Sequence, residues 1–197
     1  MDQKFKTHNR QSYRLQDYDY SCPGLYFVTI VSYKRLPIFS EIVAGEIQLS
    51  QIGKIVEGSW KDISLHFPDV SVEAYVIMPN HLHGIVKINE KRNVGATHAS
   101  PSLTKGQDSI PKGPPPQSLS AIIGSFKSAA TKRSHKAGLI KDQFIWQRNY
   151  YEHIIRDDED YQRIVEYIQY NPLNWVNDQE FVTIDSLIRK DVRLSSL

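Results

Sequence analysis

The chain has 197 residues, of which 40% are hydrophobic, and a formal net charge of only +2. This size and hydrophobic content predict one domain with its own core. The single cysteine, Cys22, excludes a disulfide within the chain and a zinc site built on several thiolates. No stretch approaches the roughly 18 apolar residues that a membrane helix needs, and no apolar segment follows the charged N-terminus. We therefore expect a soluble, cytoplasmic protein without a membrane partner.

The first half of the chain predicts three strands and one helix. Residues 25–33, LYFVTIVSY, are rich in aromatic and β-branched side chains, which favours a strand. Residues 49–67 place apolar side chains at helical spacing, and Ser50 is a typical N-cap. Residues 72–88 contain two apolar runs on either side of a Pro-Asn pair, a pattern typical of a β-hairpin.

The second half begins with a change of composition. Residues 89–117 are rich in Gly, Pro, Ser and Lys, so we expect a long flexible insertion. Residues 118–136 then carry an apolar stripe at helical spacing. Strand-like segments follow at 144–146 and 150–156. Residues 157–171 predict a closing helix, because acidic residues open it and a proline comes directly after it.

The predicted order is β-α-β-β-α-β followed by a helix, which is the order of the split-βαβ, ferredoxin-like fold. We therefore expect an α+β protein with an antiparallel sheet, helices on one face and a further C-terminal helix. The predicted organisation is a basic N-terminal arm over residues 1–24, a domain over 25–172 and a tail over 173–197, with a short helix near Ser186 as one interpretation of the tail. Because this fold serves many functions, its site residues must decide the function.

His81 and His83 are separated by one residue in the second apolar run of the predicted hairpin. Alternate residues of a strand point to the same face, so the two imidazoles would lie side by side while Leu82 points away. Two neutral imidazoles held in this way form half of a site for a divalent metal. On this spacing alone the alternative stays open: two histidines on a strand without a ligand.

The predicted closing helix offers a third ligand. Asn171 precedes Pro172 at the helix end, where its amide oxygen can reach a metal; the alternative is a cap or turn former. Two imidazoles and one amide oxygen suit Mg²⁺ or Mn²⁺, with water and substrate oxygens completing the shell. Such a metal would polarise a phosphodiester.

A tyrosine on the same helix is the candidate nucleophile. Tyr167 lies four residues before Asn171 and therefore on the same helical face. A tyrosine with a pKa of about 10 is protonated at neutral pH, so metal assistance or a nearby base would have to activate it. The alternative for Tyr167 is an ordinary amphipathic side chain at the edge of the core.

Two groups of basic residues are candidates for binding a phosphate backbone. Arg10 and Arg14 belong to the N-terminal arm. The second group lies along the predicted helix at 118–136 and consists of Lys127, Lys132, Arg133 and Lys136. Each group is equally consistent with a solvated surface.

Two ordered motifs carry a family resemblance. MPNHLHGI contains the His-hydrophobic-His element of HUH nucleases, and WQRNYYEHIIRDDEDYQRIVEYIQYNP resembles the C-terminal signature of REP-associated tyrosine transposases, a branch of the single-tyrosine HUH transposases. YDYSCPGLYFVTI and FSEI fit the same group, so the resemblance covers residues 12–172. It implies that His81 and His83 are metal ligands and Tyr167 the nucleophile. It also implies Asn171 as third ligand, where many relatives have glutamine.

The resemblance implies a transposase that cuts and rejoins single-stranded DNA with a divalent metal, Mg²⁺ or Mn²⁺. The tyrosine attacks a phosphodiester, stays linked to the 5′ phosphate and releases a 3′ hydroxyl; a second strand end reverses the step without ATP. The expected substrates are REP-like palindromes that fold as hairpins, and Arg148 is a candidate phosphate contact. Relatives act as monomers or homodimers. Three aromatic residues are candidates for stacking on bases as well as for the core: Trp146, Tyr150 and Tyr151.

Two alternatives remain at this point. One is a domesticated transposase that binds such hairpins and no longer cuts them. The other is a ferredoxin-like RNA-binding protein with accidental histidines, which predicts exposed aromatic side chains on the central strands.

Overall fold

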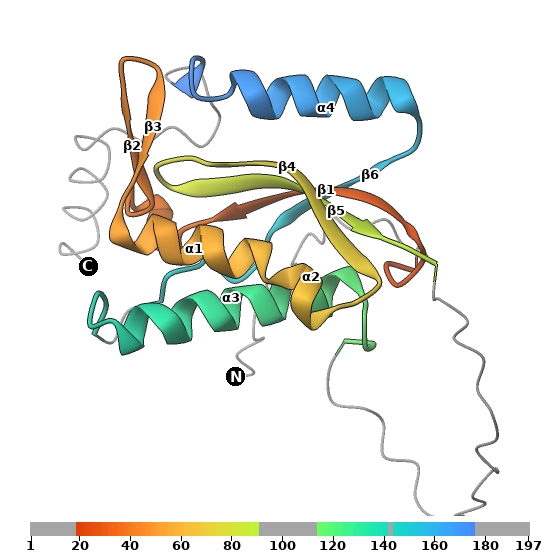
Figure 1. Ribbon diagram of the computed structural model, residues 1–197, viewed down its shortest axis with the longest axis horizontal. Coiled ribbons are helices and arrows are strands. Elements are labelled where there is room, and N and C mark those ends of the chain that lie inside the picture. The colour runs from red at the N-terminus through yellow and green to blue at the C-terminus, as the bar shows by residue number, and fades with distance from the viewer. Residues whose placement is uncertain (1–18, 91–113, 142–143, 176–197) are drawn as a thin grey trace, which may run out of the picture.

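A four-stranded antiparallel sheet lies at the centre of the fold (Figure 1). The computed structural model describes residues 19–90, 114–141 and 144–175. The strands are β1 (Gly24–Val31), β4 (Val70–Ile77), β5 (His81–Ile88) and β6 (Tyr151–Ile155), in the spatial order β4-β5-β1-β6. With the crossover helices between β1 and β4 and between β5 and β6, this is the predicted ferredoxin-like arrangement.

Three helices cover one face of the sheet: α1 (Gln51–Lys61), α2 (Ile63–His66) and α3 (Leu119–Lys136). Ser50 caps α1 as predicted, because its hydroxyl accepts a hydrogen bond from the Gly53 amide at 3.0 Å. Apolar side chains of these helices and of the facing strand positions form the larger core, which includes Tyr26, Val28, Ile30, Val56, Trp60, Leu82, Val86, Ile122, Ile123 and Phe126.

The closing helix, α4 (Asp158–Tyr170), lies on the opposite face (Figure 1). Asp157 caps it by accepting from the Asp160 amide at 2.8 Å. A second core holds α4 to the sheet and consists of Phe27, Val76, Met78, Ile85, Ile155, Ile164 and Ile168. The fold class is therefore confirmed: an antiparallel α+β sheet with the crossover helices on one face and the C-terminal helix as a separate addition.

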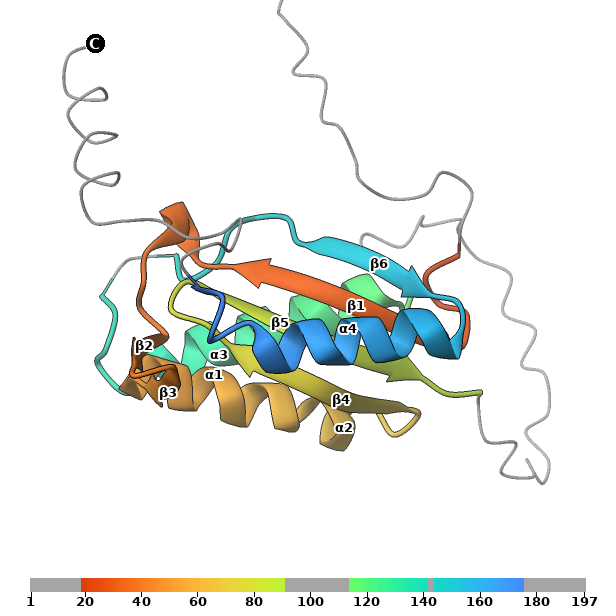
Figure 2. The same ribbon diagram turned by 90° about the horizontal axis from the view of Figure 1, so that it is seen from above.

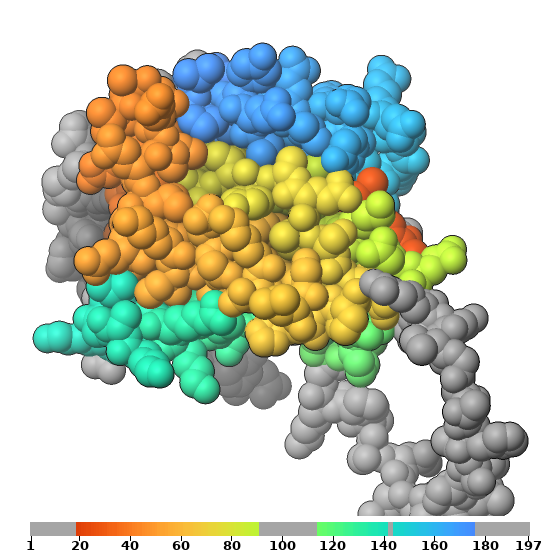
Figure 3. All heavy atoms as spheres, viewed as in Figure 1, coloured from red at the N-terminus to blue at the C-terminus, as the bar shows by residue number. Residues whose placement is uncertain are grey.

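Two elements differ from the predictions. The predicted helix at 49–67 is divided into α1 and α2, because Asp62 interrupts it. A short hairpin of β2 (Ser40–Val43) and β3 (Glu46–Leu49) was not predicted, since its strands have only four residues each. Gly45 makes its turn with φ +83°. Figure 3 shows this hairpin beside the end of α4.

The predicted strand at 144–146 forms only an isolated bridge between Ser32 and Trp146. Within the described ranges, no helix has the length and apolar character needed to cross a membrane. Residues 1–18, 91–113 and 176–197 lie outside the described part of the chain. These segments contain most of the predicted basic arm, most of the predicted insertion and most of the predicted tail.

Candidate active site

His81 and His83 open β5 and face α4 together, as the strand alternation predicts. Their Nε2 atoms are 2.9 Å apart, and both side chains are buried. Leu82 between them points into the larger core under α1 and α3. The His83 ring stacks on Phe27 of β1, with centroids 5.4 Å apart and planes at 25°. The two imidazoles are thus fixed by the sheet rather than by a loop.

Each imidazole is also held through its other nitrogen. Thr29 Oγ1 lies 2.8 Å from His83 Nδ1, and Asn80 Oδ1 lies 2.8 Å from His81 Nδ1. The Asn80 amide is oriented by its Nδ2, which donates to the Arg35 carbonyl at 3.3 Å. Since Asn80 therefore presents an oxygen to His81, Nδ1 of His81 carries the proton and its Nε2 presents a lone pair.

Tyr167 of α4 stands over the histidine pair. Its hydroxyl lies 3.1 Å from His83 Nε2, and its ring meets that of Phe27 edge-on at 6.1 Å. The side chain nevertheless remains 46% exposed, so a substrate can reach the hydroxyl. α4 carries two further tyrosines: the Tyr161 hydroxyl donates to Glu73 of β4, and Tyr170 is exposed. Tyr167 is the one that contacts the imidazoles.

Asn171 ends α4 and is buried. Four residues before it, Tyr167 contacts His83, and four residues after it, the Trp175 ring lies 5.8 Å from that of His81. The chain around Asn171 is therefore folded against the histidine pair. Trp175 was not among the predicted site residues.

The donor set fits a small divalent ion. Adjacent ligands of an octahedral ion with bonds near 2.1 Å lie roughly 3.0 Å apart, close to the 2.9 Å between the two Nε2 atoms. The same distance also allows an N–H···N hydrogen bond in the metal-free protein. Within the described residues, no cluster of three or more His, Cys, Asp or Glu side chains could hold a metal. Among the described residues, a third ligand would therefore be a group of another kind, such as the Asn171 amide.

Three residues that shape the site were not predicted from the sequence: Phe27, Thr29 and Asn80. Asn80 adjoins His81 in the sequence, so its role could have been suspected from the motif itself. Thr29 and Phe27 come from β1, and only the register that pairs Thr29 with His83 brings them here. No local sequence signal marks them.

The predicted basic helix, α3, lies on the opposite face of the sheet from α4, whose Tyr167 contacts the histidine pair (Figure 1). Two of its cations have partners within the chain. Lys127 donates to the carbonyls of Gln147 and Asn149 at 2.9 and 3.1 Å, and burial lowers its pKa to about 8. Arg133 pairs with Asp62 at 2.6 Å and binds the Ser59 hydroxyl. DNA binding by this group stays a prediction.

The other basic candidates fall into two classes. Lys132, Lys136 and Arg148 are exposed on the surface. Arg10 and Arg14 lie outside the described residues. The predicted DNA-binding role of these five residues therefore stays a prediction.

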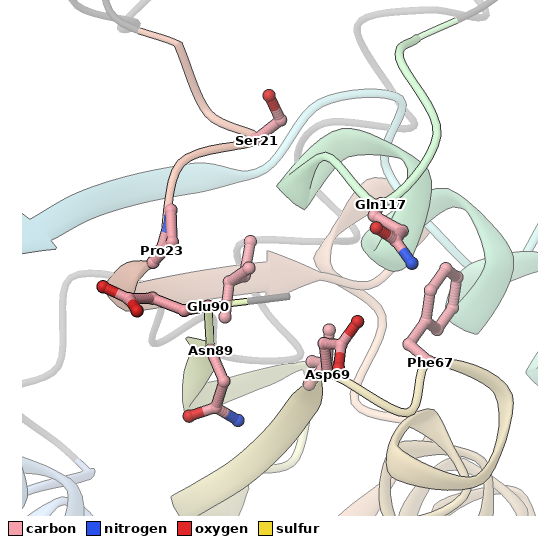
Figure 4. Close-up of a pocket in the computed structure, with 9 residues that line it drawn as sticks. Ser21, Pro23, Phe67, Asp69, Asn89, Glu90 and Gln117 are labelled. Atoms are coloured by element: carbon pink, nitrogen blue, oxygen red, sulfur yellow. The ribbon is translucent and has the colours of Figure 1, made fainter. Parts of the chain in front are cut away.

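The structure also has a cavity of about 400 Å³ at the other end of the sheet (Figure 4). Gly24 and Ile88 pair near this end, whereas Val31 and His81 pair at the end that carries the imidazoles. Its lining includes Asp69, Glu90 and Gln117. The cavity is therefore separate from the candidate active site.

Comparison with known proteins identifies relatives that match most of the chain, although no protein-family profile matches it. A Haemophilus influenzae protein without an established function is 41% identical over 175 residues, which cover 89% of this chain and 94% of that protein. A second protein of this organism, provisionally named a REP-associated tyrosine transposase, is 27% identical over 155 residues, 79% of this chain and 73% of its own length.

The fold has a counterpart among solved structures. A REP-associated tyrosine transposase bound to a REP hairpin matches with a TM-score of 0.52 and 21% identity, over 82% of this chain and 73% of that chain. This match supports the ferredoxin-like fold, and the two sequence relatives extend the similarity along most of the chain. Over most of its length the chain is therefore similar to a protein named as a REP-associated tyrosine transposase, and it shares its fold with a solved one.

Proposed function

We propose that this protein is a metal-dependent single-stranded DNA endonuclease and strand transferase that acts on REP-like hairpin DNA through a covalent 5′-phosphotyrosine. The observation that carries the proposal is the contact of Tyr167 with the histidine pair: its hydroxyl lies 3.1 Å from His83 Nε2. A nucleophile next to two preorganised imidazoles suits phosphoryl transfer. The named relative and the hairpin-bound transposase support the choice of DNA as substrate.

In the proposed reaction the Tyr167 oxygen attacks the phosphorus of a phosphodiester. The P–O bond to Tyr167 forms, and the bond to the 3′ oxygen breaks. The phenolic proton is released while the departing 3′ oxygen takes up a proton, so the step needs no net proton and no ATP. Attack by a second 3′ hydroxyl reverses it and joins two strands. The imidazoles of His81 and His83 keep their orientation throughout, because each is tied to a neighbour through Nδ1.

We propose that His81, His83 and Asn171 hold a divalent ion, Mg²⁺ or Mn²⁺. When bound there, such an ion would polarise the phosphodiester and stabilise the charge that develops on it. Phe27 closes the site on one side by stacking on His83 and excluding water from that face.

The fold gives no support to an RNA-binding sheet. That alternative needs exposed aromatic side chains on the two central strands, β1 and β5. The aromatic residues of β1, Tyr26 and Phe27, are buried in the two cores. On β5, all of which is described, the exposed residue is Lys87, which is not aromatic.

The test is incubation with a 3′-labelled hairpin oligonucleotide that carries single-stranded flanks, with Mn²⁺ or Mg²⁺, followed by denaturing electrophoresis; the 3′ label stays on the fragment that the 5′-phosphotyrosine would hold. We expect a covalent protein–DNA adduct that EDTA prevents and that Tyr167→Phe lacks. Tyr170→Phe is the matched control, because Tyr170 lies three residues further along α4 and makes no contact with the imidazoles in the structure. This variant should form the adduct normally.

The outcome separates the candidate functions. An adduct that persists in Tyr167→Phe would reject the nucleophile. Binding of hairpins without an adduct, across a set of flanking sequences, would favour the domesticated, non-cleaving protein.

A further inference from the structure

The helix that carries Tyr167 covers only part of its face of the sheet. α4 packs along β4, where the Tyr161 hydroxyl donates to Glu73 at 2.8 Å. Seen from above, β6 lies to the side of α4, beyond β1 (Figure 2). Among the described residues, Tyr151 at the start of β6 is exposed on this face, while Phe27 and Thr29 of β1 beside it are buried. We call this surface, formed by Tyr151 and the adjoining edge of β1, the open half-sheet. It adjoins the proposed active site on the side opposite to β4.

Tyr151 is the large exposed side chain of the open half-sheet. It pairs across β1 with Thr29, the residue that bonds His83. Its ring meets that of Phe27 edge-on at 6.4 Å, and Phe27 in turn contacts both His83 and Tyr167. Yet 48% of Tyr151 is exposed. An aromatic ring supported on one side and open on the other is the arrangement on which a nucleic-acid base stacks.

We infer that the open half-sheet binds the single-stranded DNA next to the cleaved bond, with one base stacked on Tyr151. This inference rests on the proposed function, because it takes Tyr167 as the residue that the phosphate must reach. The other two aromatic candidates do not suit this role. Trp146 is buried in the larger core, and Tyr150 is half-buried with the Lys127 ammonium 5.6 Å from its ring centre.

Charge gives the bound strand a direction. Arg148 is exposed three residues before Tyr151, at the end of the sheet where the histidines lie. At the other end of β6 the chain enters the first turn of α4, which carries Asp158, Glu159 and Asp160. A phosphate backbone is attracted to the first end and repelled by the second. The bound DNA strand therefore runs from Tyr167 past Tyr151 toward Arg148.

The experiment measures binding of fluorescent dT12 to the full chain over a range of salt concentrations. Stacking tolerates any base, so dT12 is a valid probe without knowledge of the natural flank. Tyr151→Ala should weaken binding on the order of tenfold with an unchanged salt slope, while Tyr151→Phe and Tyr151→Trp keep it within about twofold. Arg148→Ala should instead lower the salt slope by about 0.7, one phosphate contact.

A second measurement locates the strand directly. Ultraviolet irradiation of dT12 containing 5-iodouracil should crosslink the peptide that contains Tyr151. Lys54→Ala is the control, because Lys54 is exposed on α1 across the sheet and should change neither the affinity nor the slope. Crosslinks confined to α1 or α3, or wild-type affinity in Tyr151→Ala, would overturn the inference.

The two proposals fail in different ways. A preparation that forms the covalent adduct on hairpin DNA but binds dT12 equally well after Tyr151→Ala rejects the open half-sheet and keeps the nuclease. A preparation that binds dT12 through Tyr151 and forms no adduct keeps the open half-sheet as a binding surface and rejects the nuclease.

Discussion

The side-chain oxygen of Asn80 lies 2.8 Å from Nδ1 of His81 and sets which nitrogen of that imidazole faces its partner. The opposite end of the amide is held by the Arg35 carbonyl in the loop after β1. A neighbour in the sequence thus becomes an orienting group, because a third segment of the chain fixes its rotation.

This relationship predicts the effect of Asn80→Ala on metal binding. Without the acceptor, His81 can adopt the tautomer that presents N–H to the site, so Mn²⁺ affinity should fall about 10- to 100-fold. Free Mn²⁺ measured by electron paramagnetic resonance during titration reports this affinity. Ser40→Ala is the matched control, since it removes a buried hydroxyl that donates to the Ile77 carbonyl rather than to an imidazole. Equal affinities in the two variants would refute the role given to Asn80.

Phe27→Ala should affect stability and chemistry together. Removal of this buried ring should lower the free energy of unfolding by about 3–5 kcal/mol and free the rings of His83 and Tyr167 to move. Phe126→Ala removes a ring of the same size from the core under α1 and α3. We expect similar unfolding midpoints in urea for both variants. Adduct formation by the folded fraction should slow only in Phe27→Ala, and an equal rate in the two would contradict the prediction.

Two glycines of α1 should respond to alanine in opposite directions. A Cβ at Gly53 would lie 1.9 Å from the Phe39 carbonyl oxygen, a backbone atom that cannot move aside, whereas a Cβ at Gly58 would meet nothing within 4 Å. Gly53→Ala should therefore cost about 1–3 kcal/mol of stability, and Gly58→Ala should gain up to about 1 kcal/mol from helix propensity. Thermal unfolding of the two variants checks this, and a change of the same sign in both would be inconsistent with the close approach.

Lys127 predicts a pH dependence. Burial lowers its pKa from 10.5 to about 8, so between these values the unfolded chain binds more protons and stability rises with pH. Relative to Lys127→Met, the wild type should gain on the order of 2 kcal/mol between pH 7 and pH 9.5. Urea denaturation of both proteins at the two pH values measures the difference between their free energies of unfolding. Titrations of other groups affect both proteins equally and cancel in this difference. A stability difference between the two proteins that does not change with pH would show that Lys127 is not buried as described.

The sequence alone was sufficient for the features that repeat over short distances. Strand alternation placed His81 and His83 on one face, and helical spacing joined Tyr167 to the end of the closing helix, because both patterns follow from backbone geometry within one element. Element order likewise predicted the ferredoxin-like sheet. The four-residue strands of the β2–β3 hairpin were too short to give a periodic signal.

The histidine pair itself was ambiguous in the sequence, and only the tertiary structure brought a tyrosine hydroxyl to 3.1 Å from it. Thr29 and Phe27 join the site through the register of β1, and Trp175 through the return of the chain after α4. The structure also put the basic helix α3 on the opposite face and left Tyr151 exposed beside the site. These relationships depend on which apolar faces pack together across the sheet, and no local pattern encodes that choice.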